Sequence, residues 1–325
     1  MFKKINFKKL FFVGALAVCS LIGITNVSAA TGTLTFEHSG YWWTRTNPGS
    51  SDLHSWYMEN YNFGNRVAYC IEPGVPEGTT YTAGTMSDIN MYSNAQKERM
   101  ILVAYYGYDY TGHQNQRYRM ATQSLLWETA GTGYTTISTE RWGAGTVIDL
   151  TNERNNINNL VAHHYDKPSF NGSTHTLQVG QSITLTDSNG VLGNYNVSVS
   201  GANYNVNGND LTITPTVSGE VTIKLTKKMY TDKTYIVYYG DGQNMLVAGT
   251  VDPVVATVKV NSYLGSVEMT KADAVTEKAQ GQATLKGAKY GVYEQSTGKL
   301  VTTFTTDESG NAKSDNVLIK HCTSI

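Results

Sequence analysis

Hydrophobic and polar positions alternate most regularly in the middle of this 325-residue chain. A period of two is typical of strands that bury one face, and the turn sequences SNG, NGND and GDG separate the apolar runs. We therefore predict an all-β, immunoglobulin-like sandwich over residues 171–262. The positions that carry this pattern are Ile183, Leu185, Tyr195, Val197, Val199, Leu211, Ile213, Val221, Ile223 and Leu225.

The preceding region, residues 30–170, combines helical periods with short strands. Apolar spacing and end signals predict helices over residues 94–107, 116–130 and 151–164. The expected fold class is therefore multi-domain and mainly β, with a mixed α/β first domain.

Composition supports this fold class and excludes some partners. Tyr, Thr, Val, Gly and Asn are abundant, which favours β-structure, and the length allows two or three domains. A formal net charge of −1 argues against broad electrostatic capture of nucleic acid or of an anionic membrane.

The first residues predict a secretory signal peptide over residues 1–29. Four lysines precede the apolar run Leu10–Ile24, and Val27-Ser28-Ala29 resembles a cleavage site. The rival interpretation is a membrane anchor, but the run is short for a span of about 20 residues. We expect a secreted chain that does not insert into the membrane once the signal is removed.

Cys70 is the central cysteine of a chain that has three. Cys19 falls in the signal, and Cys322 lies in another predicted domain, so a disulfide is not expected. Cys70 belongs to a predicted strand over residues 66–72 and shares a face with Glu72. It is either a buried structural residue or a reactive one.

Gln123 is the polar exception on the apolar face of the second predicted helix. At about 100° per residue it lies with Met120, Leu126 and Trp127. A buried amide must be hydrogen-bonded or chemically consumed. Gln123 therefore either caps the backbone of a neighbouring strand or reacts.

The two residues occur in paired motifs, Tyr69-Cys70-Ile71 and Thr122-Gln123-Ser124-Leu125-Leu126-Trp127. This pair resembles the bacterial thioester domains of Gram-positive surface proteins, over about residues 31–170. The resemblance implies an internal thioester that joins Cys70 Sγ to the side-chain carbonyl carbon of Gln123 with loss of ammonia. It also implies a monomeric surface adhesin, not an enzyme, that binds a host protein or another amine nucleophile covalently and needs no cofactor or metal.

An attacking lysine amine is mostly protonated at neutral pH, because its pKa is about 10.4. A nearby base would therefore assist the reaction. Glu72 and His113 are the candidates, and each is alternatively an ordinary surface or turn residue.

Residues 263–325 resemble the Cna protein B-type domain, a stalk module of Gram-positive adhesins. The resemblance implies that Lys271 would form an isopeptide bond with a late Asn or Asp, but the late strands of the module are not recognisable. We expect an incomplete module in which Lys271 has no partner and Cys322 no function, and a full-length form at the cell wall or surface. The matching segments are residues 269–273, 285–288 and 305–310.

Two other functions remain open at this point. A secreted cysteine hydrolase would use Cys70 with His113, His163 or His164. A non-covalent binding module would use a tyrosine-rich face and bury Cys70 without using it. Intact mass separates these alternatives, because only the thioester removes ammonia.

Overall fold

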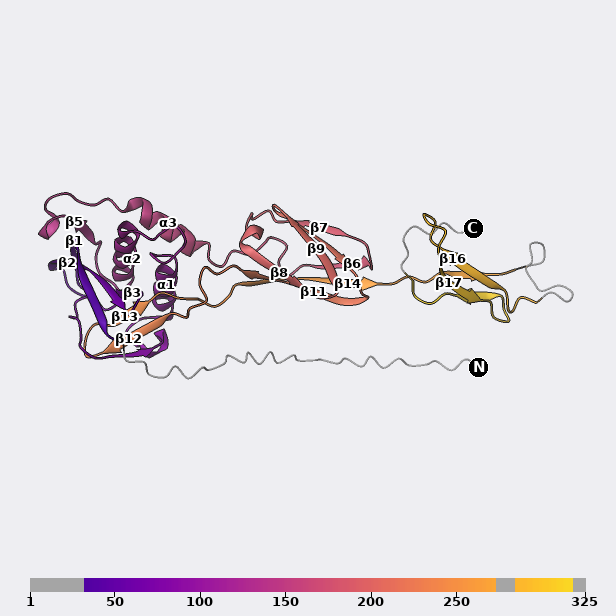
Figure 1. Cartoon of the computed structure of the whole chain (residues 1–325), viewed down its shortest axis with the longest axis horizontal. Coiled ribbons are helices and arrows are strands. Elements are labelled where there is room, and N and C mark those ends of the chain that lie inside the picture. Colours follow the sequence, from indigo (N-terminus) through magenta and orange to yellow (C-terminus); the bar gives the residue numbers. More distant parts are fainter. Residues whose placement is uncertain (1–31, 273–283, 318–325) are drawn as a thin grey trace.

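A computed structural model describes residues 32–272 and 284–317 of the chain. The predicted signal peptide with Cys19, and also Cys322, lie outside the described residues. Three units follow one another along the long axis of the molecule (Figure 1). The chain is multi-domain and mainly β, which confirms the predicted fold class. In the described ranges, no helix is long and apolar enough to cross a membrane.

The first unit is a seven-stranded sheet in the order β4-β12-β13-β3-β2-β1-β5, and every neighbouring pair is antiparallel. Its strands are β1 (Leu34–Thr46), β2 (Leu53–Phe63), β3 (Arg66–Cys70), β4 (Tyr81–Gly84), β5 (Thr136–Ser138), β12 (Ile236–Gly240) and β13 (Met245–Val247).

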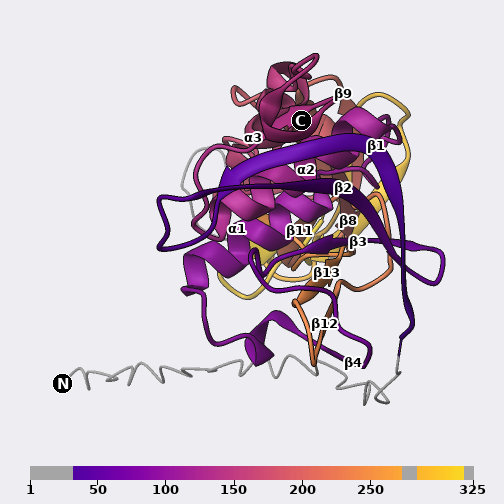
Figure 2. The same cartoon turned by 90° about the vertical axis from the view of Figure 1, so that its left-hand side faces the viewer.

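Three helices pack on this sheet: α1 (Asn94–Tyr105), α2 (Gln116–Thr129) and α3 (Thr151–Ala162). Each begins where the sequence predicted and ends one or two residues earlier. Ser93 and Gln96 form a capping box at the start of α1. Figure 2 looks onto this unit and shows the long, curved β1 and β2 in front of α1 and α2.

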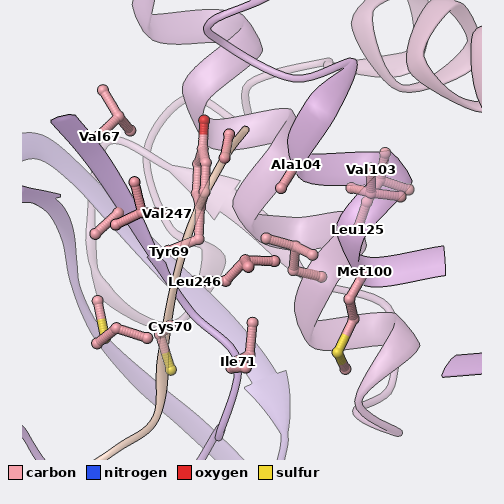
Figure 3. Packing of buried hydrophobic residues seen from close by; sticks show 14 of the residues in the cluster. Val67, Tyr69, Cys70, Ile71, Met100, Val103, Ala104, Leu125, Leu246 and Val247 are labelled. Atoms are coloured by element: carbon pink, nitrogen blue, oxygen red, sulfur yellow. The ribbon is translucent and has the colours of Figure 1, made fainter. Parts of the chain in front are cut away.

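Strand β3 lies inside the sheet and contacts α2, so apolar side chains cover it from both sides. Tyr69 and Ile71 are almost fully buried. Figure 3 shows Leu246 of β13 and Ile71 together with Met100 of α1 and Leu125 of α2. This packing fixes the position of Cys70 at the end of β3.

The second unit is a sandwich of a three-stranded and a four-stranded sheet, in the orders β7-β10-β9 and β6-β14-β11-β8. The alternating residues named above, including Leu211, Ile213 and Ile223, form its core. Strands β14 and β6 pair in parallel, and the other pairs are antiparallel. Its strands are β6 (Thr174–Gln178), β7 (Ile183–Thr186), β8 (Tyr195–Val199), β9 (Ala202–Asn207), β10 (Asp210–Pro215), β11 (Gly219–Lys227) and β14 (Val255–Tyr263).

The predicted boundary of this sandwich, residues 171–262, is wrong for one segment. The hairpin β12–β13 returns to the first unit, where β13 pairs with β3. The GDG turn at residues 240–242 is one of the signals that assign this segment to the sandwich, but a turn signal does not report which sheet the flanking strands join. The first unit is therefore built from two separate stretches of the chain.

The third unit contains two small sheets, β15–β18 and β16–β17. In its described part the apolar cluster comprises Val292, Phe304 and Ala312. Lys271 Nζ donates a hydrogen bond to the carbonyl oxygen of Thr284, at 3.1 Å. The likeness to a Cna B-type module stays a prediction. The strands are β15 (Glu268–Thr270), β16 (Lys289–Tyr293), β17 (Leu300–Thr305) and β18 (Asn311–Lys313).

Limited proteolysis should remove this third unit first. Its small buried cluster stabilises it less than the larger cores stabilise the first two units, so it opens more often. Mass spectrometry of the digest should show a resistant fragment that ends near Tyr263. Initial cleavage inside the sandwich or the seven-stranded sheet would contradict this order of stability.

Candidate functional site

Cys70 is the last residue of β3, and its thiol is free and buried, with 2% of the residue exposed. On one side β3 pairs with β13, where Cys70 lies opposite Met245. On the other side the ladder with β2 runs only as far as the pair of Ala68 with Tyr61. The peptide groups of Cys70 on this second side therefore need another partner.

Gln123 supplies that partner. Its Oε1 accepts a hydrogen bond from the backbone N–H of Cys70 at 2.9 Å, and its Nε2 donates one to the carbonyl oxygen of Cys70 at 2.7 Å. The side-chain amide thus takes the place of a strand residue at the point where the sheet ladder ends. Of the two roles left open for Gln123, the contacts show the first: Gln123 caps a neighbouring strand, and the strand residue is Cys70 itself.

Helix α2 holds the amide in this position. Asn115 caps the helix by accepting hydrogen bonds from the N–H groups of Arg117 and Tyr118. Gln123 is 3% exposed and lies among buried neighbours on the helix, Met120 and Leu126 included. Because both Cys70 and Gln123 lie in packed elements, their relative position has little freedom to vary.

A pocket of about 470 Å³ leads from the surface to Cys70. Its floor includes Cys70 and Trp127, which are both buried, whereas Trp56 and Trp142 at its edge are more than half exposed. Trp142 has a positive φ of 62°, an uncommon backbone conformation for a residue with a side chain. The remaining lining residues are Trp43, Arg45, Asn47, His54, Ser55, Tyr57, Tyr61, Gly74, Val75, Pro76, Glu77, Arg141 and Gln243.

Two of the lining residues form a polar pair near the thiol. The hydroxyl of Tyr61 donates a hydrogen bond to Oε1 of Glu77. Burial raises the pKa of Tyr61, and the negative charges that Cys70 and Glu77 can carry raise it further, so the phenol stays protonated and acts as a donor. Glu77 is thereby a carboxylate held at the wall of the Cys70 pocket.

The candidate bases predicted from the sequence lie elsewhere. Glu72 does not line the pocket, and its Oε2 accepts a hydrogen bond from the N–H of Asn244 at 3.1 Å. His113 is buried near α1, with Nδ1 2.9 Å from the carbonyl oxygen of Tyr106 and its ring stacked on Tyr118. Neither candidate base therefore lines the pocket that contains Cys70.

The imidazoles proposed for a cysteine hydrolase are also outside the pocket. His163 Nδ1 lies 2.6 Å from Asp166, and His164 Nδ1 lies 2.8 Å from the hydroxyl of Tyr106. Burial and the nearby Lys227 lower the pKa of His164 to about 4. The imidazole that does line the pocket belongs to His54, an exposed residue of β2.

Sequence reasoning missed Arg45, Tyr61, Glu77 and Gln243. They come from β1, β2 and two loops, and Gln243 lies in the β12–β13 turn that the sequence assigned to the sandwich. No spacing rule links such positions, because the sheet topology alone brings them together. In the described ranges, no group of His, Cys, Asp or Glu could hold a metal ion.

Comparison with known proteins agrees with this geometry. Residues 67–168 match the family model described as "TED: Thioester domain". This segment contains both Cys70 and Gln123. No curated protein matches the chain.

The thioester domain of the Staphylococcus aureus TIE protein has a similar structure, with a TM-score of 0.59 and 21% sequence identity. The match covers 72% of this chain and 99% of the TIE domain chain. At this identity the likeness shows the fold. The covered share of the chain exceeds residues 67–168, so the common fold extends beyond that segment.

Replacing Gln123 by Leu should destabilise the protein even where no thioester can form. In a Cys70→Ala background, the change leaves one buried N–H and one buried C=O without partners. We expect a loss of about 2–4 kcal/mol in the free energy of unfolding, measured with urea.

The matched control is Gln114→Leu in the same background, because Gln114 is exposed and lies just before the same helix. This change should cost less than about 1 kcal/mol. Equal stability of the two double variants would show that the amide of Gln123 does not support β3.

Proposed function

We propose that this chain is a bacterial surface adhesin that binds an amine-bearing ligand covalently through a thioester between Cys70 and Gln123. The observation that carries the proposal is the docking of the Gln123 carboxamide on the peptide groups of Cys70 itself, at the floor of a pocket. The match of residues 67–168 to the thioester-domain family supports it.

The bond would form when the sulfur of Cys70 attacks the side-chain carbonyl carbon of Gln123. The C–N bond of the carboxamide breaks, and the nitrogen leaves as ammonia after taking up the thiol proton. Two hydrogen bonds to the backbone of Cys70 hold the amide beside the nucleophile, which raises its effective concentration. No cofactor is needed for this step.

Capture of a ligand breaks the thioester that the first reaction formed. The ligand amine attacks the thioester carbon, the C–S bond breaks, and an amide bond then links the ligand to residue 123. A thiolate is a far better leaving group than an amide nitrogen, so the thioester reacts where the original carboxamide would not. The aromatic walls of the pocket, Trp43 and Trp127 among them, keep water from the bond before a ligand arrives.

The rest of the chain fits a role in presenting the reactive unit at a distance from the cell. The reaction links one ligand to one chain and regenerates no thioester, so the protein acts as a binder and not as an enzyme. The sandwich would serve as a stalk between the reactive unit and the cell, in a secreted protein held at the wall or surface. An amine on a host surface protein is the proposed target.

The proposal predicts a specific mass. Mature, folded protein should weigh about one ammonia, roughly 17 Da, less than its sequence, because the thioester forms with loss of ammonia. Incubation with methylamine should then add the mass of methylamine at Gln123. Electrospray mass spectrometry followed by peptide mapping measures both changes.

Cys70→Ala should abolish both mass changes, and Cys322→Ser should leave both intact. Full sequence mass in freshly folded wild-type protein would exclude the thioester. It would then favour either of the alternatives in which Cys70 keeps its thiol.

Glu77 is the carboxylate that the pocket offers as a base for the incoming amine. Glu77→Gln removes the carboxylate but keeps an acceptor for Tyr61, so the rate of methylamine addition at neutral pH should fall by about tenfold or more. Glu72→Gln is the matched control and should change the rate little, because Glu72 does not line the pocket. A wild-type rate in Glu77→Gln would show that Glu77 is not the base.

A further inference from the structure

Arg45 of β1 is a buried cation beside the thiol of Cys70. The residue is 3% exposed, and its guanidinium lies over two indole rings, 4.2 Å from the centre of Trp43 and 4.5 Å from that of Trp127. The two rings contact each other edge to face, so both meet the cation on one side. These cation–π contacts favour the charged side chain at this buried position.

The guanidinium of Arg45 has a buried N–H group that forms no hydrogen bond within the described part of the chain. Its Nη1 donates to Oδ1 of Asn47 and to the carbonyl oxygen of Thr46. Its Nε is buried and has no partner among the described residues, and no described carboxylate forms an ion pair with it. A buried charge without a counter-charge is costly, so it is rarely kept without a use.

Trp127 also carries a buried N–H group without a hydrogen-bond partner in the described ranges. It lies one helical turn after Gln123, lines the Cys70 pocket, and its buried Nε1–H finds no hydrogen-bond acceptor among the described residues. The pocket thus contains two unsatisfied donors, one of them on a cation. Both donors line the same pocket as the thiol of Cys70, and both act to lower the pKa of that thiol. An anion formed at this sulfur during the reaction is therefore an acceptor that would use them.

We propose that Arg45 and Trp127 form an anion site that stabilises the thiolate of Cys70 when the thioester forms and when it is cleaved. The inference rests on the proposed thioester and adds the residues that make it both formable and reactive. It assigns to Arg45 a catalytic role that neither its sequence context nor the family match provides.

The step is balanced without any further reagent. In cleavage, the amine nitrogen bonds to the thioester carbon, the C–S bond breaks, and its electron pair stays on the sulfur of Cys70. The ammonium proton passes to a base or to water, and the thiolate is later protonated by solvent. The negative charge that develops on sulfur is what Arg45 and Trp127 would stabilise.

The surroundings of the Cys70 thiol disfavour its thiolate, so the thiolate needs groups that stabilise its negative charge. Burial raises the pKa of Cys70 to about 11, and the Trp127 N–H, the backbone at Glu72 and the Arg45 charge act in the opposite direction. The carboxylate of Glu77 raises it further, whereas Tyr61 and Tyr92 are neutral groups nearby. Although burial also lowers the pKa of Arg45 to about 10, the guanidinium stays charged at neutral pH.

The first experiment measures reaction rates in the full chain. Arg45→Met, which keeps much of the apolar volume, should slow both ammonia loss during refolding and methylamine addition by at least about tenfold. Arg45→Lys keeps a charge and should recover part of this loss. Trp127→Phe keeps a ring but removes the donor, and it should slow methylamine addition by a smaller factor.

The second experiment does not need the thioester. In a Gln123→Ala, Cys322→Ser background, the pH dependence of the reaction of Cys70 with methyl methanethiosulfonate reports the pKa of its thiol. Arg45→Met should raise this pKa by about one unit, which lowers the reaction rate about tenfold between pH 8 and 9. Trp127→Phe should raise it by less.

The outcomes separate the two proposals. Full mass in the wild type would exclude the thioester, and the thiol measurement would still decide the role of Arg45. Wild-type rates and an unchanged thiol pKa in Arg45→Met would overturn the anion site. If Arg45→Met does not fold, Trp127→Phe decides, because an unchanged rate and thiol pKa in that variant overturn the site equally.

Discussion

The site depends on one local mismatch between two strands. Strand β2 stops pairing with β3 at Ala68, two residues before Cys70. The peptide N–H and C=O of Cys70 that have no strand partner would therefore be unsatisfied in the closed core. Helix α2 supplies the missing hydrogen-bond partner through the side chain of Gln123. The requirement that buried peptide groups be hydrogen-bonded thus places a carboxamide beside a thiol before any chemistry occurs.

The same requirement connects the site to the topology of the whole unit. β3 is held on its other side by β13, which the chain supplies only after the sandwich strands β6 to β11 and before the last sandwich strand, β14. Arg66 at the start of β3 donates hydrogen bonds to the carbonyl oxygens of Thr234 and Ala248, which flank the β12–β13 hairpin. The reactive strand is therefore complete only when the second stretch of the chain has returned.

The sequence predicted those features that local patterns encode. Helical spacing placed Gln123 on a buried face, alternation located the strand of Cys70, and paired motifs joined the two residues. It could not predict Gln243 or Glu77 at the site, because both are loop residues that only long-range strand pairing brings near. Neither Glu72 nor His113 lines the pocket. The strand predicted over residues 66–72 ends at Cys70, before Glu72, and a position just before a helix does not determine where the side chain of His113 lies.

The return of the chain through β12 and β13 has a mechanical consequence. A pull on the third unit runs along the continuous backbone of β14 and enters the first unit at β13. β13 adjoins β3, and β3 is bonded to the side chain of residue 123. If the chain captures a ligand as proposed, tension would therefore reach the strand of Cys70 through the backbone of β14 and the β13–β3 pairing, while the ladders of β14 with β6 and β11 share the load.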